Sequence, residues 1–308
     1  MKIVFAGTPQ FAVSSLKELH KAGFDIAAVL TQPDRPQGRK GILTPPPVKE
    51  AAMELNIPVI QPEKLKADYS VLADIGADLM VTCAYGQILT QEILDLFPKG
   101  VWNVHASLLP AYRGAAPIAR AIIDGETETG VTIMKTDAGL DTGDMLLSAK
   151  TEISPLDTYD TLMGRLAFLG AKLIVEALQK IEAGNIELKK QGDGFVCKKV
   201  VRTQVDFSKS AEEVSRLIRG LASSPLAFGT VEGLTLNFYH AEAQEYSGDE
   251  LFGTVLVSDA KGGFVVKCGE GAVRITEIQP AGGKVMSDKD FCNGRKVKVG
   301  QRFDQPVL

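Results

Sequence analysis

Three polar residues in the middle of the chain have the types and spacing of a site that works on a carbonyl group. Asn103 and His105 are two positions apart in Val-Trp-Asn-Val-His, and Asp141 lies in Gly-Leu-Asp-Thr-Gly-Asp. An amide can donate to a developing oxyanion, an imidazole can donate to it or shuttle a proton, and a carboxylate can fix the tautomer and support the charged ring. These residues therefore favour attack on a carbonyl carbon.

The same stretch resembles no site with an activated nucleophile. Residues 101–144 contain no cysteine, and Ser107 has only an indirect route to His105. Covalent catalysis needs a nucleophile beside a base that activates it. We therefore expect direct transfer to an outside acceptor, without a covalent enzyme intermediate.

A short strand should carry the amide and the imidazole side by side. Val101, Asn103 and His105 alternate along the chain, and alternate residues of a strand share one face. Pro110 and Gly114 then break the chain into a loop. His105 should consequently lie near the carboxyl end of its strand, where open parallel sheets carry their clefts.

A second strand should bring in the acid. The apolar run 130–134 leads into residues 136–143, whose glycines permit a tight turn from which Asp141 can project toward the histidine. Asp137 and Asp144 compete with Asp141 for this place, although both can also act simply as turn-forming residues.

The surrounding pattern predicts an α/β fold in two parts. A strand over 2–6, an amphipathic helix over 10–22 and a strand over 25–31 form a β-α-β unit of the doubly wound, Rossmann-like kind. Only Gly7 stands in the first turn, so the G-x-G-x-x-G fingerprint is missing and a nicotinamide cofactor is disfavoured. Single cores stop growing near roughly 250 to 300 residues, so a chain of 308 residues should divide in two. We end the first domain at about residue 184.

The rest of the chain predicts a linker and a small β domain. Residues 185–205 carry five basic and two acidic side chains, and they include Lys189 and Lys190. Short alternating segments with glycine turns fill residues 206–308, which indicates a small OB-like β-barrel. The linker is either a solvated hinge or a positive bridge along which an RNA backbone could lie.

Composition sets further limits. The chain is 45% hydrophobic and 23% charged, which is typical of a globular protein. No run approaches the roughly 20 consecutive apolar residues that cross a bilayer, so we expect a cytoplasmic protein with no membrane contact. We also expect a monomer. Its four cysteines are widely spaced, which supports neither a metal site nor a disulfide framework. A net charge of −4 does not indicate a nucleic-acid binder, so any RNA contact must depend on local patches.

The motifs together resemble a known family. The signature of the 10-formyltetrahydrofolate-dependent formyltransferases is similar to Asn103-x-His105, Ser107-Leu108-Leu109-Pro110, Arg113-Gly114 and Gly139-Leu140-Asp141-Thr142-Gly143-Asp144. The run 113–118 and the two-part chain resemble the members that formylate initiator methionyl-tRNA. The resemblance implies catalytic roles for Asn103, His105 and Asp141, with 10-formyltetrahydrofolate as co-substrate and no metal.

It also implies two sets of binding residues. The folate contacts it implies are Ser107, Leu108, Leu109 and Pro110, together with Tyr85, Gly86, Gln87 and Ile88, the latter four largely through the backbone. The tRNA contacts expected from it and from the basic linker are Arg35, Arg39, Lys40, Lys189 and Lys190. The loop departs from the usual Gly-Arg-Gly-Lys-Lys order, because residues 38–41 read Gly-Arg-Lys-Gly.

Two alternatives remain open at this point. Relatives that formylate nucleotide-linked amino sugars share Asn-x-His and the distal aspartate, but the basic loop and the barrel-like carboxyl part argue against them. A non-catalytic RNA-binding protein is the other alternative. The net negative charge of the chain and the presence of all three residues Asn103, His105 and Asp141 argue against it. For the loops, ordinary packing or a solvated basic surface explains the same residues.

Overall fold

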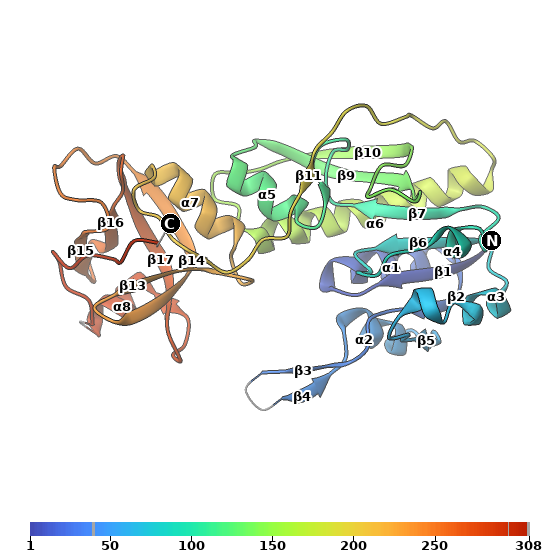
Figure 1. The fold of residues 1–308 in the computed structure, drawn as a ribbon, viewed down its shortest axis with the longest axis horizontal. Coiled ribbons are helices and arrows are strands. Elements are labelled where there is room, and N and C mark those ends of the chain that lie inside the picture. Colours follow the sequence, from blue (N-terminus) through green and yellow to red (C-terminus); the bar gives the residue numbers. More distant parts are fainter. Residues whose placement is uncertain (39–40, 295, 307–308) are drawn as a thin grey trace. The chain divides into compact units, whose positions relative to one another are not determined.

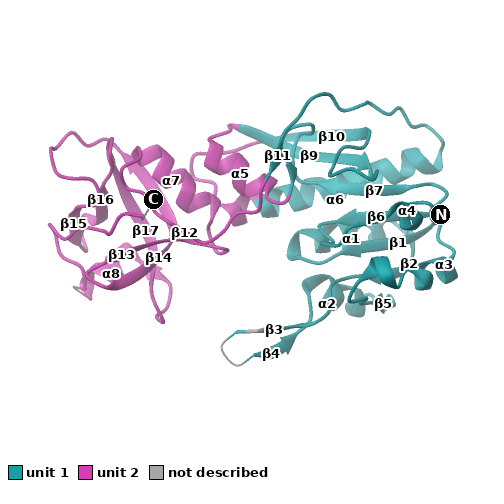
Figure 2. Ribbon diagram, in the orientation of Figure 1, with its two compact units in different colours: residues 1–114, 128–151, 163–197 teal, residues 115–127, 152–162, 198–308 magenta. Residues whose placement is uncertain are grey.

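A computed structural model describes residues 1–38, 41–294 and 296–306 of the chain. Arg39 and Lys40, two of the expected tRNA contacts, lie outside the described residues. The chain forms two compact units: residues 1–114, 128–151 and 163–197 make up unit 1, and residues 115–127, 152–162 and 198–308 make up unit 2 (Figure 2). The division into a first domain that ends at residue 184, a linker over 185–205 and a domain over 206–308 stays a prediction.

The elements follow one another as shown in Figure 1. Those up to β10 are β1 (Lys2–Gly7), α1 (Gln10–Lys21), β2 (Asp25–Leu30), β3 (Arg35–Gln37), β4 (Ile42–Thr44), α2 (Pro47–Glu54), β5 (Val59–Ile60), the 3₁₀ helix η1 (Leu65–Ala67), α3 (Ser70–Ile75), β6 (Leu79–Cys83), α4 (Gln91–Leu94), β7 (Val101–His105), β8 (Arg113–Gly114), α5 (Pro117–Asp124), β9 (Glu128–Lys135) and β10 (Met145–Glu152). The others are α6 (Tyr159–Glu182), β11 (Val196–Cys197), β12 (Thr203–Gln204), α7 (Ala211–Gly220), β13 (Ala227–Val231), β14 (Leu234–Gln244), β15 (Val255–Asp259), β16 (Gly263–Lys267), β17 (Ala272–Pro280), β18 (Met286–Ser287) and α8 (Asp288–Asn293).

Unit 1 is built on a seven-stranded sheet of order β10-β9-β7-β6-β1-β2-β5. The five strands from β7 to β5 run parallel, and β9 joins β7 antiparallel. This confirms the expected Rossmann-like α/β sheet. From β1 the chain proceeds outward to β2, whereas β6 adds on the other side of β1. Loops that follow β1 and β6 therefore leave a topological switch point, where ligands of such sheets bind.

The faces of this sheet are covered by helices because its strands are apolar on both sides. Val4, Ala6 and Met80 pack in one core cluster with Leu72 of α3 and Ile93 of α4. On β7 and β9, α6 approaches closely: a Cβ at Gly170 would lie 2.9 Å from the Val104 side chain. Burial on both faces explains why these strands read as near-continuous hydrophobic runs.

Unit 2 contains a mostly antiparallel sheet of order β12-β13-β14-β17-β16-β15, with β18 paired to β17. Its core gathers four phenylalanines, Phe207, Phe238, Phe264 and Phe303, in tilted and edge-on ring contacts. Helix α7 begins at a capping box, in which the Ser210 hydroxyl accepts from Glu213 N and the Glu213 carboxylate accepts from Ser210 N. The antiparallel β domain is confirmed, and its OB-like topology stays a prediction.

Two features bear on the expectations from sequence. The proline-rich basic loop contains an antiparallel pair, in which Arg35 of β3 faces Thr44 of β4. None of the helices within the described residues is both long and apolar enough to cross a membrane.

Candidate active site

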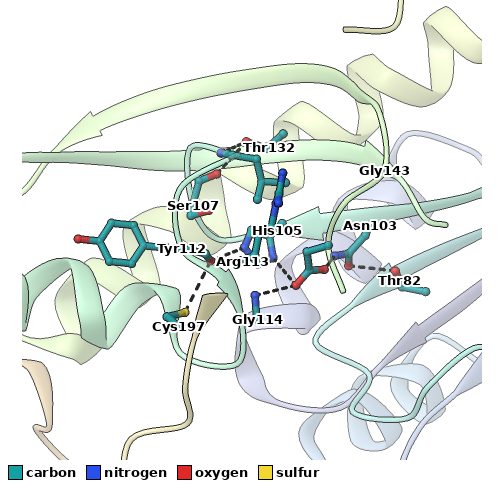
Figure 3. Close-up of polar contacts among 12 residues, drawn as sticks. Thr82, Asn103, His105, Ser107, Tyr112, Arg113, Gly114, Thr132, Gly143 and Cys197 are labelled. Carbon is teal, nitrogen blue, oxygen red and sulfur yellow. Dashed lines mark hydrogen bonds and ion pairs between the residues drawn. The ribbon is translucent and has the colours of Figure 1, made fainter. Parts of the chain in front are cut away.

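Strand β7, which lies between β6 and β9 in the unit 1 sheet, carries both the amide and the imidazole, as predicted. Asn103 lies opposite Thr82 of β6, and His105 lies opposite Thr132 of β9. Figure 3 shows Asn103 and His105 near the end of the strand, with Tyr112 and Gly114 of the following loop close to the ring. The neighbouring strands thus supply the groups that orient both side chains.

Thr82 fixes the orientation of the Asn103 amide. Its hydroxyl donates to Asn103 Oδ1 over 2.9 Å, so the Nδ2 end of the amide must face the other way (Figure 3). Nδ2 lies 3.3 Å from Asp141 Oδ1. An amide nitrogen carries two hydrogens, so one remains for an oxygen that approaches the site.

The carbonyl of Tyr112 fixes the tautomer of His105. His105 Nε2 lies 2.9 Å from Tyr112 O, and a carbonyl oxygen can only accept, so Nε2 carries a hydrogen. The neutral ring then has its lone pair on Nδ1, which lies 3.6 Å from Asp141 Oδ2. The whole residue is only 5% exposed, and the group that faces Nδ1 is the Asp141 carboxylate. The sequence predicted tautomer control by Asp141, whereas this backbone carbonyl provides it.

Asp141 reaches the histidine from a strained turn. Its φ is +52°, in the left-handed region that non-glycine residues rarely occupy. Its Oδ2 accepts a hydrogen bond from Gly114 N over 2.9 Å. A Cβ at Gly143 would collide with the carbonyl of Lys135, so only glycine fits where the loop rejoins the sheet. Asp137 is used elsewhere, since its carboxylate accepts from Gly139 N and the Thr142 hydroxyl.

The three predicted side chains therefore converge. The Asp141 carboxylate lies 3.3 Å from the Asn103 amide nitrogen and 3.6 Å from His105 Nδ1. This arrangement can stabilise an oxyanion and move a proton.

The loop after β7 presents few of its expected folate contacts as side chains. Ser107 is buried and its hydroxyl donates to Ala111 O, while Leu109 is buried and Leu108 and Pro110 are half-buried. The Thr132 hydroxyl accepts from Leu109 N and donates to Ser107 O, which holds this loop against β9. These four residues remain predicted contacts.

The loop after β6 lies at the switch point of the sheet. Tyr85 is buried and burial raises the pKa of its hydroxyl to about 12, while its carbonyl accepts from Thr8 and Gln32. Gln87 is half-buried and bridges Leu65 N and Pro62 O. Gly86 and Ile88 are exposed. The four residues of this loop remain predicted folate contacts.

A cavity of about 420 Å³ lies at the amino end of β7. It is lined by Leu94, Phe97 and Val101 and by polar groups that include Gln91 and Asp137. The hydroxyl of Thr136, another lining residue, is buried without a hydrogen-bond partner. None of the eight expected folate residues lines it. Sequence reasoning missed this cavity, because α4 was not recognised.

The expected basic contacts divide in two. Arg35, Lys189 and Lys190 are exposed, and none of them forms an ion pair within the described parts of the chain. Lys49, from the same proline-rich stretch as Arg35, instead binds Asp34 over 2.8 Å. The side chain of Gln61 and that of Lys49 hold the pKa of Asp34 below its usual value. Lys49 is thus a structural residue at the base of the hairpin.

Within the described residues, neither the cysteines nor the possible metal ligands form a reactive site. All four cysteines are free and buried, and burial raises the pKa of the Cys83 thiol to about 12. Among residues 1–38, 41–294 and 296–306, no three His, Cys, Asp or Glu side chains gather into a group that could hold a metal ion.

Several supporting residues could not be found from sequence motifs. The Tyr112 carbonyl and Gly114 N act through the backbone, which residue type does not reveal. Thr82 gave a weak signal, as a hydroxyl in an otherwise apolar strand beside β7. Gln191, which is 50 residues from Asp141, gave none, although its amide donates to Asp141 O over 2.9 Å.

Fold and site together define an α/β protein with a three-residue polar centre at one strand of its parallel sheet. A family model described as "Formyl transferase" matches residues 1–178, and one described as "Formyl transferase, C-terminal domain" matches residues 199–296. The chain belongs to the formyl transferase family.

Within that family the chain is similar to curated methionyl-tRNA formyltransferases. That of Janthinobacterium sp. (strain Marseille) is 44% identical over 307 residues, covering 96% of this chain and 97% of the relative. That of Neisseria meningitidis serogroup C (strain 053442) is 45% identical over 308 residues, covering 97% and 99%. The recognition made from the motifs is confirmed.

Solved structures share the fold at low identity. An N-formyltransferase from Helicobacter canadensis, in complex with folinic acid and dTDP-3-aminofucose, has a TM-score of 0.67 at 22% identity and covers 89% of this chain and 98% of its own. HypX from Aquifex aeolicus, in complex with tetrahydrofolic acid, has a TM-score of 0.67 at 18% identity and covers 100% of this chain and 51% of its own.

Proposed function

We propose that this protein transfers a formyl group from 10-formyltetrahydrofolate to the α-amine of methionine esterified to initiator tRNA. The nearly full-length similarity to curated methionyl-tRNA formyltransferases supports the acceptor, and membership of the formyl transferase family supports the reaction. The observation that carries the chemistry is the convergence of Asn103, His105 and Asp141 at one strand of the parallel sheet.

The geometry indicates the order of proton movements. The free amine attacks the formyl carbon, and the carbonyl oxygen becomes an oxyanion that accepts from Asn103 Nδ2. His105 Nδ1, which carries the lone pair, takes a proton from the attacking nitrogen and becomes imidazolium. It then gives that proton to the folate nitrogen as the carbon–nitrogen bond of the donor breaks. One C–N bond forms, one breaks, and His105 returns to its starting state.

The imidazolium stage is supported from both sides of the ring. Tyr112 O accepts from Nε2, and the Asp141 carboxylate lies 3.6 Å from Nδ1. A positive charge on a ring this well buried needs such partners, because burial alone disfavours the charged form. Asp141 therefore stabilises the ring when it holds the extra proton.

The loops that follow β6 and β7 support a place for the folate. Tyr85 to Ile88 follow β6 and Ser107 to Pro110 follow β7, so both segments leave the carboxyl ends of neighbouring parallel strands. Ligands of such sheets bind at these ends of the strands. A folate held by the two loops would bring its one-carbon substituent to Asn103 and His105, toward the carboxyl end of β7.

Exposed basic residues outside the catalytic centre would hold the tRNA backbone. Arg35 lies on β3, while Lys189 and Lys190 lie on the segment that follows α6. Lys and Arg contacts to phosphate give affinity that falls with salt. Because the chain as a whole is acidic, we assign tRNA binding to such local groups.

The direct test follows the label from a formyl donor. The protein is incubated with labelled 10-formyltetrahydrofolate and, separately, with charged initiator tRNA, charged elongator tRNA or a nucleotide-linked amino sugar. We expect label in the initiator methionyl-tRNA. Label only in the amino sugar would assign the other acceptor class, and RNA binding without turnover would indicate a non-catalytic binder.

A further inference from the structure

The segment that follows α6 is hydrogen-bonded to the loops of the active site. Lys189 and Met145 exchange both backbone hydrogen bonds, each 2.9 Å long. Farther along, β11 pairs with β8, and Arg113 N donates to Phe195 O over 3.1 Å. Residues 189–197, which we name the strap, therefore form part of the framework of the site rather than a free connection.

At the centre of the strap, one side chain bonds the turn that carries Asp141. Gln191 Nε2 donates to Asp141 O over 2.9 Å and to Gly143 O over 2.7 Å. A primary amide nitrogen has two hydrogens, so both are used. The two carbonyls flank Thr142, and one amide thus fixes the path of the backbone on both sides of it.

Arg113 fixes which way that amide points. Its Nε donates to Gln191 Oε1 over 2.9 Å, and its Nη2 donates to Gly192 O over 3.0 Å. A guanidinium has no acceptor, so the oxygen end of the amide must face Arg113 and the nitrogen end must face the turn. Gly114, the next residue, donates from its backbone to Asp141 Oδ2. Arg113 therefore holds the Asp141 backbone through Gln191, and Gly114 holds the Asp141 carboxylate directly.

Asp141 depends on such support. A left-handed conformation is unfavourable for a non-glycine residue, and it persists only where surrounding contacts impose it. A different backbone angle at residue 141 would swing the carboxylate away from His105 Nδ1, which it faces at 3.6 Å.

We propose that Gln191, oriented by Arg113, is a positioning residue that sets the Asp141 carboxylate against His105 for formyl transfer. Gln191 is half-buried beside the turn and acts on the reaction only through the Asp141 backbone. The inference rests on the proposed function, because it concerns the efficiency of that reaction.

Gln191→Met tests this role, since it keeps the length of the side chain and removes the amide. A displacement of about 1 Å in a catalytic group can cost up to a hundredfold, so we expect kcat to fall about 10- to 100-fold with KM for both substrates within about threefold. Asp193→Ala is the matched control: it alters an exposed residue of the strap to which no part in catalysis or binding is assigned, and it should leave kcat unchanged.

A double-mutant cycle with Asp141→Asn separates positioning from general structural damage, because groups that act as a unit are non-additive. In the Asp141→Asn background, Gln191→Met should have little further effect on the single-turnover rate. A full additional loss in that background, or a rise in KM alone, would overturn the proposal.

Two further measurements keep the result interpretable. If Gln191→Met does not fold, as judged by thermal unfolding, Arg113→Met removes the bonds to Gln191 Oε1 and Gly192 O but keeps the Gln191 amide, and it should give a smaller loss with the same non-additivity. If the unaltered protein does not formylate methionyl-tRNA, the proposed function fails. If it does and Gln191→Met leaves kcat unchanged, the positioning role alone fails.

Discussion

His105 Nε2 donates to the carbonyl oxygen of Tyr112 over 2.9 Å, and this one bond fixes the tautomer of the neutral ring. Because Nε2 holds its hydrogen against a fixed acceptor, Nδ1 carries the lone pair of the neutral ring. The Asp141 carboxylate faces that same nitrogen. In the proposed reaction Nδ1 is therefore the nitrogen that takes up the proton, and the bond to Tyr112 holds the ring in its orientation.

Replacing His105 by glutamine separates these two functions of the ring. The amide nitrogen of the introduced side chain can occupy the place of Nε2 and still donate to Tyr112, but nothing replaces Nδ1. Since general acid–base catalysis contributes roughly 10²- to 10⁴-fold, we expect kcat of His105→Gln to fall by at least about a hundredfold. Thermal unfolding should change little, and near-normal turnover in the folded variant would refute proton transfer by Nδ1.

Replacing Thr82 by valine should misorient the amide donor. The change keeps the shape of the side chain but removes the hydroxyl that donates to Asn103 Oδ1. An unsatisfied acceptor at this site costs roughly 1 to 3 kcal/mol of stability, and we expect a loss in kcat of about tenfold. Thr31→Val is the control, because the Thr31 hydroxyl is buried without a partner and its removal should cost neither stability nor rate. Equal effects of the two changes would exclude a specific role for Thr82.

Sequence patterns predicted the parts of unit 1 that depend on side-chain type. Strand β1 was expected over 2–6 and spans Lys2–Gly7, and β2 was expected over 25–31 and spans Asp25–Leu30. Buried parallel strands are apolar on both faces, so a short run between turn residues identifies them. The same logic placed Asn103 and His105 on one strand and Asp141 on the facing turn.

Features that depend on the backbone or on distant pairing were not predictable. Helix α5 was not predicted, although it has a proline at its start and ends before Gly125. Its eight residues are too few for helical periodicity to identify it. The β3–β4 pairing joins strands of three residues each, too short for periodicity to reveal. Gln191 contacts a turn 50 residues earlier, and nothing in its local sequence marks that contact.

The bond between Asp34 and Lys49 should make hairpin stability depend on pH. Hydrogen bonds from Gln61 and from Lys49 lower the pKa of Asp34 below its usual value of 3.8. A carboxyl with a lowered folded-state pKa contributes stability above its unfolded pKa and loses it as pH falls through the folded value. The difference in thermal midpoint between the parent and Asp34→Asn should therefore be present at about pH 6 and shrink below about pH 4. A difference that grows on acidification would contradict this assignment.

Removing exposed basic residues should weaken tRNA binding without affecting the chemistry. We expect Arg35→Ala and Lys189→Ala each to raise KM for methionyl-tRNA several-fold with kcat nearly unchanged, because neither residue contacts the catalytic side chains. Each lost phosphate contact should also reduce the slope of log KM against log salt by up to about 1. Lys17→Ala is the matched control, since Lys17 is exposed but paired with Glu54 over 2.9 Å. Steady-state kinetics over a series of salt concentrations measures both quantities. If Lys17→Ala changed the salt slope as much as Lys189→Ala, binding would depend on overall charge, and the proposed phosphate contacts would be wrong.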